Sequence, residues 1–202
     1  MTFKELYYKY IRELWLLFTT IVWTVPYFYI NKFSVGRTEM GLNTYLDSVI
    51  PALPFTVLIY VSIFIVVFMP YFIVKNKERF KAVAKSYLAG MGIGYLTFLL
   101  LPIKVIRPVI INPDLFSKML QILYSHDFPY NSFPSLHVAL SLLSGLIIYH
   151  ENKSWGKVIL IWAGLIALST LTTKQHTIMD VLGGLTVGMF SYWVYLKLIR
   201  EE

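Results

Sequence analysis

Residues 54–74, PFTVLIYVSIFIVVFMPYFIV, form a continuous apolar stretch that decides the class of fold. A helix needs roughly 17–25 predominantly apolar residues to cross the hydrocarbon core of a bilayer, so this stretch can span a membrane. Five further apolar stretches lie at residues 11–30, 86–103, 134–149, 158–173 and 178–198. We therefore predict an all-α integral membrane protein that is built as a six-helix bundle.

The composition of the 202-residue chain excludes several other classes of protein. Charged residues make up 14% of the chain and hydrophobic residues 57%, whereas soluble domains carry about 25% charged residues. The net charge of +7 fits orientation in a bilayer better than binding to nucleic acid. The absence of cysteine excludes disulfides, thiolate metal sites and a cysteine nucleophile. We expect one membrane domain over residues 1–202, with a core at about residues 50–200.

The distribution of basic residues predicts the orientation of the spans. Lys and Arg in the segments on the side of the N-terminus outnumber those on the other side by two to one, and most of the excess lies in residues 75–85. Because cytoplasmic loops carry the excess of Lys and Arg, both termini are expected in the cytoplasm. The plasma membrane is the expected location. Residues 41–50 are expected to form a short amphipathic helix on the outer surface. Residues 104–133 are expected to form the longest outer loop.

Three polar clusters lie at span ends that the six-span topology brings to the outer side. They are Arg107-Pro108 after the third span, residues 131–137 (NSFPSLH) at the start of the fourth, and residues 172–180 (TTKQHTIMD) between the fifth and sixth. Polar and ionisable groups at membrane depth are costly and tend to be functional. We therefore predict an active site at the outer face. The Gly-x-x-x-Gly repeats at residues 90–94 and 184–188 are instead interpreted as close helix contacts.

The second cluster has the features of an anion site at the start of a helix. Asn131 or Ser132 can cap the helix, and Pro134 suits its first turn. This arrangement leaves the amides of Ser135 and its neighbours free to bind an anion. His137, one turn into the helix, can then exchange a proton with the bound group. The alternative is an ordinary helix start with an interfacial histidine.

In the third cluster, His176 and Asp180 are spaced to share one face of a helix. A carboxylate bound to one imidazole nitrogen fixes the tautomer and makes the other nitrogen a better nucleophile or base. The alternative is a buried structural pair, and a metal site is disfavoured because no second histidine follows at the required spacing. Arg107 and Lys174 would supply positive charge for a phosphate, or would simply reach the membrane interface. Together the clusters favour phosphoryl transfer through a phosphohistidine, with no metal or cofactor. The nearby pair His126–Asp127 is interpreted as loop structure.

These motifs resemble those of the type-2 phosphatidic acid phosphatase superfamily. Its first motif ends in Arg-Pro, which matches Arg107-Pro108; its second is Pro-Ser-Gly-His, which matches residues 134–137 with Leu136 in place of Gly. Its third begins with Ser-Arg and continues with His and Asp, which match His176 and Asp180. The sequence departs from the pattern at Leu100 and Thr170, where the superfamily has Lys and Arg. Residues 133–137 (FPSLH) and 173–176 (TKQH) look more like the branch that contains inositol phosphorylceramide and sphingomyelin synthases.

The resemblance implies a role for each matching residue. His176 would be the nucleophile, Asp180 would orient it, and His137 would act as the acid and base. The phosphate would be bound by Arg107, by Ser135 with the backbone amides of Ser135 and Leu136, and by Lys104 and Lys174.

Three functions are compatible with this interpretation. The first is a membrane lipid phosphatase that hydrolyses a lipid phosphomonoester or pyrophosphate through a phosphohistidine. The second is a phosphotransferase that moves a phospho-head group to a lipid or polyol alcohol. The third is a transporter, which is disfavoured because the polar clusters gather on one face. The expected partners are a lipid phosphate or phospholipid and the bilayer itself.

Overall fold

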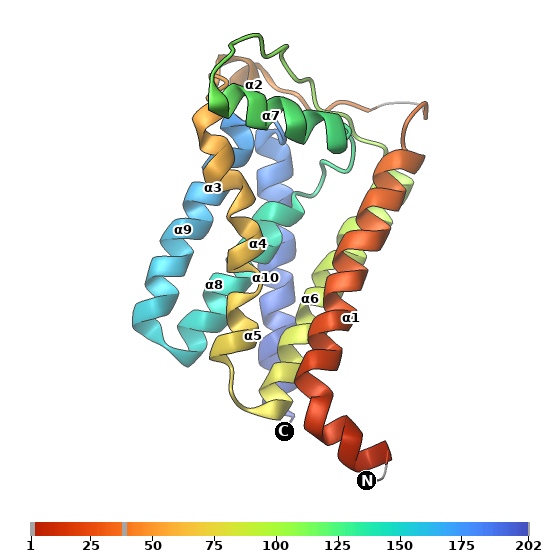
Figure 1. The fold of residues 1–202 in the computed structure, drawn as a ribbon, viewed down its shortest axis with the longest axis vertical. Helices are drawn as coiled ribbons and strands as arrows, with labels where there is room; N and C mark the ends of the chain where they lie inside the picture. The colour runs from red at the N-terminus through yellow and green to blue at the C-terminus, as the bar shows by residue number, and fades with distance from the viewer. Residues whose placement is uncertain (1–2, 38–39, 202) are drawn as a thin grey trace.

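The computed structural model describes residues 3–37 and 40–201, and within these ranges the protein is a bundle of helices. The elements in chain order are α1 (Phe3–Phe33), α2 (Tyr45–Val49), the 3₁₀ turn η1 (Pro54–Thr56), α3 (Val57–Val61), α4 (Ile63–Val66), α5 (Met69–Ile73), α6 (Lys77–Leu100), α7 (Leu115–His126), α8 (Leu136–Glu151), α9 (Lys153–Thr172) and α10 (Ile178–Arg200). The described ends of the chain lie at one end of the bundle, whereas α2 and α7 lie across the other (Figure 1).

The described residues form helices and no named strand, which confirms an all-α fold, and five segments are long and apolar enough to cross a membrane, which is compatible with an integral membrane protein. They are Tyr10–Phe33, Pro54–Ile73, Lys77–Leu100, Lys153–Thr172 and Ile178–Arg200. The sixth predicted span corresponds to α8, which has 16 residues. At 1.5 Å per residue this helix is about 24 Å long, less than the roughly 30 Å of the hydrocarbon core. The six-span count therefore stays a prediction.

The ends of the predicted third span, residues 86–103, differ from those of the observed helix α6. Helix α6 begins at Lys77, nine residues before the predicted start, because Asn76 caps it by accepting hydrogen bonds from the amides of Glu78 and Arg79. It ends at Leu100 rather than at Ile103, since Pro102 disfavours helical geometry at the residue before it.

The predicted second span is not one continuous helix. Residues 54–73 consist of η1, α3, α4 and α5 in succession. Pro70 lies at the start of α5, and because proline has no amide hydrogen, the helical bonding cannot run through it.

The predicted outer loop contains a helix that the apolar pattern did not reveal. Helix α7 is capped by Asp114, whose carboxylate accepts hydrogen bonds from the amides of Phe116 at 3.0 Å and Ser117 at 3.1 Å. The short helix expected at residues 41–50 is narrower, as only Tyr45–Val49 are helical. Helix α7 lies across the end of the bundle that carries α2 and covers part of it (Figure 1).

Glycine residues allow α6, α8 and α10 to pack closely, which confirms the interpretation of the two Gly-x-x-x-Gly repeats. A Cβ atom at Gly184 would lie 2.5 Å from the carbonyl oxygen of Ser135, and one at Gly188 would lie 2.8 Å from that of Ala139. A Cβ at Gly90 would lie 2.6 Å from the hydroxyl of Ser191. Only a residue without a side chain permits these approaches, so the start of α8 is held firmly against α10.

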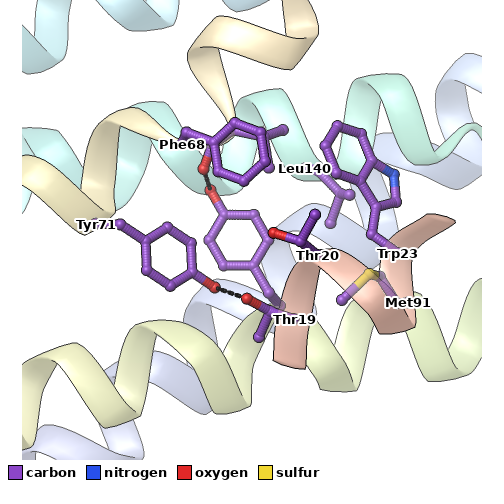
Figure 2. A pocket seen from close by; sticks show the side chains of 9 residues that line it. Thr19, Thr20, Trp23, Phe68, Tyr71, Met91 and Leu140 are labelled. Carbon is purple, nitrogen blue, oxygen red and sulfur yellow. Dashed lines mark hydrogen bonds between the residues drawn. The ribbon is translucent and has the colours of Figure 1, made fainter. Parts of the chain in front are cut away.

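The middle of the bundle contains a small hollow whose polar groups are paired. The Tyr71 hydroxyl donates to Thr19 Oγ1 at 2.9 Å, and Figure 2 shows the two side chains pointing toward each other beside Trp23 and Met91. The Tyr87 hydroxyl lies 2.5 Å from Ser144 Oγ. These pairs satisfy hydroxyl groups that would otherwise be costly to bury.

Candidate active site

The three predicted clusters meet at the end of the bundle that carries α2 and α7. Arg107 follows α6, His137 lies in the first turn of α8, and His176 precedes α10. Direct contacts join the clusters: the ring centroids of His137 and His176 lie 5.6 Å apart, and Arg107 donates to the side chain of Gln175. The tertiary structure therefore assembles one site from segments that lie up to about seventy residues apart in the chain.

His176 is buried and its ring is oriented by the backbone. Its Nδ1 atom lies 3.0 Å from the carbonyl oxygen of Ser132, and the residue is 7% exposed. A carbonyl oxygen can only accept a hydrogen bond, so Nδ1 of the neutral ring carries the proton. The other ring nitrogen, Nε2, then holds a free lone pair, as a nucleophile requires.

Asp180 supports His176 less directly than its spacing suggested. The distance from Asp180 Oδ2 to His176 Nδ1 is 3.7 Å, within range of an ion pair but longer than a hydrogen bond. The same oxygen accepts a hydrogen bond of 2.7 Å from the amide of Thr177, and Thr177 caps α10 in return. Asp180 is fully buried. The carboxylate thus closes the start of α10 and places negative charge beside the imidazole.

The turn before His176 is shaped by one carbonyl group. The oxygen of Thr170 accepts hydrogen bonds from the amides of Gln175 at 3.0 Å and His176 at 3.1 Å. Lys174, which lies between Thr170 and these two residues, is in the left-handed region, with φ of 54°. This closed turn brings the histidine back over the end of α9. Thr170 stands where the superfamily has an arginine, and its hydroxyl bonds within α9 to Ala167.

His137 is held by an aromatic contact rather than by a hydrogen bond to a carbonyl. Its ring stacks on Tyr60 with the centroids 4.2 Å apart and the planes at 25°. The stacking constrains the plane of the ring. A partly buried imidazole beside the nucleophile can exchange a proton with a group bound there.

The start of α8 differs from the prediction in its cap. The N-cap is Ser135, whose hydroxyl accepts from the amide of Val138, and Pro134 therefore precedes the cap instead of occupying the first turn. Asn131 and Ser132 bond to other segments, to the carbonyls of Tyr27 and Ile103. The helix begins later because the left-handed conformation of Asn131, with φ of 56°, interrupts it.

The predicted anion site at this helix start is partly occupied by the protein itself. The amide of Ser135 donates to the carbonyl of Asp180 at 3.0 Å, and Ser135 is fully buried against Gly184. Leu136 is 4% exposed. Neither residue lines the cleft beside His176. The bond from Ser135 to Asp180 instead ties α8 to α10.

Arg107 and Lys174 line the same cleft as His176, which has a volume of about 470 Å³. Arg107 donates to the carbonyl of Asp127 at 2.5 Å and lies 4.7 Å above the ring of Tyr124. Lys174 donates to the carbonyls of Asp47 and Ile50 at 2.8 and 2.5 Å. Burial lowers the pKa of Lys174, and the nearby Asp47 carboxylate partly offsets this. Two cationic side chains therefore line the same cleft as His176.

Lys104, the remaining predicted phosphate ligand, lies outside this cleft. It lines a neighbouring hollow with Met40 and Asn43, and its ammonium is 5.8 Å above the ring of Tyr130. The backbone explains its position, because the amide of Lys104 donates to Met40 in a bridge between two loops.

Three contributors to the site were not identified from the sequence. The Ser132 carbonyl is a backbone group, so the pattern of side chains could not indicate its role. Tyr60 could not be distinguished from the other aromatic residues of the spans. Gln175 belongs to the third cluster, but only the structure shows that it is buried and accepts a hydrogen bond from Arg107. In the sequence, only its position next to His176 indicated that Gln175 could belong to the site.

Asp47 links α2 to the site. Its carboxylate accepts a hydrogen bond of 2.8 Å from the amide of Ile178 at the start of α10. Burial would raise the pKa of Asp47, but hydrogen bonds from Thr44 and from Ile178 and the charge of Lys174 hold it below its usual value. Among the described residues, no group of three or more His, Cys, Asp or Glu side chains lies close enough to hold a metal ion.

A comparison with known families agrees with this arrangement. The model of the PAP2 superfamily matches residues 36–194, a range that contains every residue of the cleft and both histidines. No curated protein and no solved structure matches the chain. Members of this superfamily are phosphatases and phosphotransferases, and the five apolar segments are compatible with an integral membrane enzyme. The chain belongs to the PAP2 superfamily, the type-2 phosphatidic acid phosphatases and their relatives.

Proposed function

We propose that the protein is a membrane lipid phosphatase that hydrolyses a lipid phosphomonoester or pyrophosphate through a phosphohistidine at His176. One observation carries this proposal: Nδ1 of His176 is bound to the Ser132 carbonyl, while the ring lines a cleft with Arg107 and Lys174. A nucleophile and two cations around one hollow suit a phosphate group.

In the first step, Nε2 of His176 forms a bond to phosphorus as the ester P–O bond breaks. His137 donates a proton to the departing alcohol oxygen, because an alcohol leaves more readily than an alkoxide. The phosphorylated imidazole carries positive charge, which the Ser132 carbonyl and the Asp180 carboxylate stabilise. The Arg107 guanidinium offsets negative charge on the phosphoryl oxygens.

In the second step, a water molecule attacks phosphorus and the P–N bond breaks. His137, now neutral, accepts a proton from the water, and inorganic phosphate leaves the cleft. The same site would act as a phosphotransferase if an alcohol replaced the water. The stretches FPSLH at residues 133–137 and TKQH at residues 173–176 support that alternative, because they resemble the lipid phosphotransferase branch of the superfamily.

We place the cleft at the extracytoplasmic face, with both termini in the cytoplasm of a plasma-membrane protein. The excess of basic residues on the side of the termini supports this orientation. The described chain ends also lie at the opposite end of the bundle from α2 and α7 (Figure 1). Since the chain contains no cysteine, single cysteines introduced near Val109 and Lys153 can be tested with an impermeant thiol reagent on intact cells.

The decisive experiment traps the phosphoenzyme. Purified protein in lipid nanodiscs is mixed with a ³²P-labelled lipid phosphate, quenched, and examined for protein-bound label that is labile in acid and stable in base. We expect label on the wild type and none on His176→Ala, with turnover reduced more than about 10⁴-fold. His150→Ala is the matched control, because His150 is exposed and lies in the last turn of α8.

The products of the same reaction separate the two alternatives. Release of inorganic phosphate alone supports the phosphatase, whereas a new phosphorylated lipid after addition of alcohol supports the phosphotransferase. Normal turnover by a folded His176→Ala variant would rule out both, because the two functions share the covalent intermediate.

A further inference from the structure

Another hollow, separate from the cleft, is lined by His137. It has a volume of about 130 Å³ and is lined mainly by apolar and aromatic side chains of α1, α3, α4, α7 and α8. Among them are Trp23, Tyr27, Tyr60, Phe64, Leu123 and Leu136. We call it the aromatic cavity. Two histidines and one aspartate, His126, His137 and Asp127, also line it, which distinguishes it from the paired polar hollow in the middle of the bundle.

Asp127 is an acidic residue among the mainly apolar side chains that line the aromatic cavity. The sequence pattern placed it in a loop, but it is the C-cap of α7 and is 8% exposed. The Tyr27 hydroxyl donates to its Oδ1 atom at 2.9 Å. Burial raises the pKa of Asp127, and the Arg107 guanidinium and the Tyr27 hydroxyl partly offset this. The proposed two-step reaction leaves this buried carboxylate without a role.

The cavity and the cleft meet at two pairs of residues. Arg107, in the cleft, donates to the backbone carbonyl of Asp127, whose side chain lines the cavity. His176, in the cleft, lies 5.6 Å from His137, in the cavity, between ring centroids. A phosphate in the cleft would therefore have its ester oxygen directed toward the aromatic cavity, past the two histidines.

The aromatic cavity also reaches the lipid-facing surface. Phe28 of α1 and Phe64 of α4 both line it and are 54% and 52% exposed on segments that are apolar enough to cross a membrane. The volume is below the roughly 300–1,000 Å³ of pockets that enclose a drug-sized ligand. It can hold the head of a long chain, and the remainder would extend between α1 and α4 into the bilayer.

We propose that the aromatic cavity binds a free long-chain alcohol, whose hydroxyl group is positioned by Asp127 beside His137. The inference rests on the proposed function, because the alcohol is the group that leaves or accepts the phosphoryl group. A carboxyl oxygen accepts a hydrogen bond from the hydroxyl of an alcohol, whereas the ester oxygen of a phosphate ester has no proton to donate to it. Asp127 therefore favours the free alcohol over the phosphate ester, and makes the alcohol a competitor of water.

The transfer that follows is balanced without any further reactant. Before transfer, the bound hydroxyl donates to Asp127. As its oxygen turns and bonds to phosphorus, the bond from phosphorus to Nε2 of His176 breaks and the hydroxyl proton passes to His137. The products are a phosphorylated long-chain alcohol and the free enzyme. Asp127 is a positioning residue throughout, since it neither bonds to phosphorus nor keeps the proton.

Binding is tested first, independently of turnover. A dodecanol analogue that carries a photoreactive diazirine is irradiated with the protein in nanodiscs, and labelled peptides are mapped by mass spectrometry. We expect label in the peptides that contain residues 23–28 or 123–127, and competition by dodecanol but not by dodecane. Thr24→Trp should reduce this label about tenfold, because the indole narrows a cavity that Thr24 lines. Val25→Trp is the matched control, since Val25 is 61% exposed and lies outside the cavity.

Partitioning of the phosphoenzyme tests the role of Asp127. With labelled enzyme, the ratio of dodecyl phosphate to inorganic phosphate is measured and compared with the ratio for butanol. We expect a higher ratio for dodecanol than for butanol, because only the long chain fills the cavity, and we expect Asp127→Asn to reduce the ratio of dodecyl phosphate to inorganic phosphate about tenfold or more, as for the loss of a hydrogen bond to a charged group. Asp114→Asn is the control, because Asp114 caps the opposite end of α7 and is exposed.

The outcomes distinguish this inference from the proposed function. If the phosphoenzyme forms but photolabel falls only on lipid-facing surfaces and resists competition, the inference is overturned and the proposed function stands. Equal partitioning to dodecanol and butanol in the wild type would also overturn it. If no phosphoenzyme forms, the proposed function fails, while competed label at residues 23–28 would still establish the alcohol site.

Discussion

Helices α8 and α10 both begin beside a histidine, but their starts are built differently. In α10 the histidine, His176, precedes the cap Thr177, and Thr177 and Asp180 form a reciprocal pair of hydrogen bonds. In α8 the histidine, His137, follows the cap Ser135, whose single side-chain bond is 3.4 Å long. The bond from the amide of Ser135 to the carbonyl of Asp180 joins the two starts.

The difference suits two distinct chemical roles. A directional hydrogen bond to the Ser132 carbonyl orients His176 and presents one nitrogen, as attack on phosphorus requires. His137 is held by stacking on Tyr60, which constrains the ring plane without a hydrogen bond to a carbonyl. A nucleophile profits from a fixed direction, whereas an acid and base must hold a proton in one step and release it in the next.

Replacing His137 should separate these roles most clearly. We expect His137→Gln to slow phosphoenzyme formation from a lipid phosphate by roughly 10²–10⁴-fold, the usual contribution of general acid catalysis. An aryl phosphate with a good leaving group should lose much less, because its oxygen needs no proton. Rapid-quench measurement of the label with both substrates checks this. Equal losses would make His137 a phosphate ligand or a structural residue.

The carboxylate of Asp180 should have an intermediate effect. Asp180→Asn keeps an oxygen that can accept from Thr177 but removes the charge 3.7 Å from His176. Since interactions with a charged group contribute about 1.5–3 kcal/mol, we expect turnover to fall roughly 10–100-fold, with residual activity. Thermal unfolding of the same variant measures its stability separately. A variant as inactive as His176→Ala would show that Asp180 does more than stabilise and position the ring.

The stacking partner of His137 should matter less. Tyr60→Leu removes the aromatic contact and is expected to reduce turnover about threefold to tenfold, since such contacts contribute roughly 0.5–1.5 kcal/mol. Tyr60→Phe retains the ring and serves as the control. If the two variants lose the same activity, then the Tyr60 hydroxyl, and not the stacking, is what the site uses.

Removal of divalent metals should have the smallest effect. We expect activity to survive dialysis against EDTA, because Arg107 and Lys174 supply the positive charge beside His176. Vanadate should inhibit, as it resembles the five-coordinate phosphoryl group. Loss of activity in EDTA, with recovery on adding Mg²⁺, would contradict the proposed site.

Much of the site could be predicted because its side chains stand at the ends of apolar segments. Arg107, His137 and His176 each follow or begin such a segment, and alternating spans return these ends to one side of a bundle. Ser135 and Lys104 show the limit of this argument. Both lie at the correct end, yet Ser135 packs against Gly184 and Lys104 lies in a neighbouring hollow. Their place depends on the packing of helices and on a backbone bridge, neither of which follows from residue spacing.

By itself, the sequence determined the all-α class of fold and the glycine contacts and indicated the candidate site residues, because hydropathy, residue size and side-chain chemistry act locally. Only the tertiary structure decided which atom orients His176, where α7 lies and which cations share the cleft. A backbone carbonyl such as that of Ser132 is present in every residue, so its role is invisible until another segment approaches it. The same reason explains Asp127. The sequence around it is typical of a loop, and its side chain is buried only because α1 packs against the end of α7.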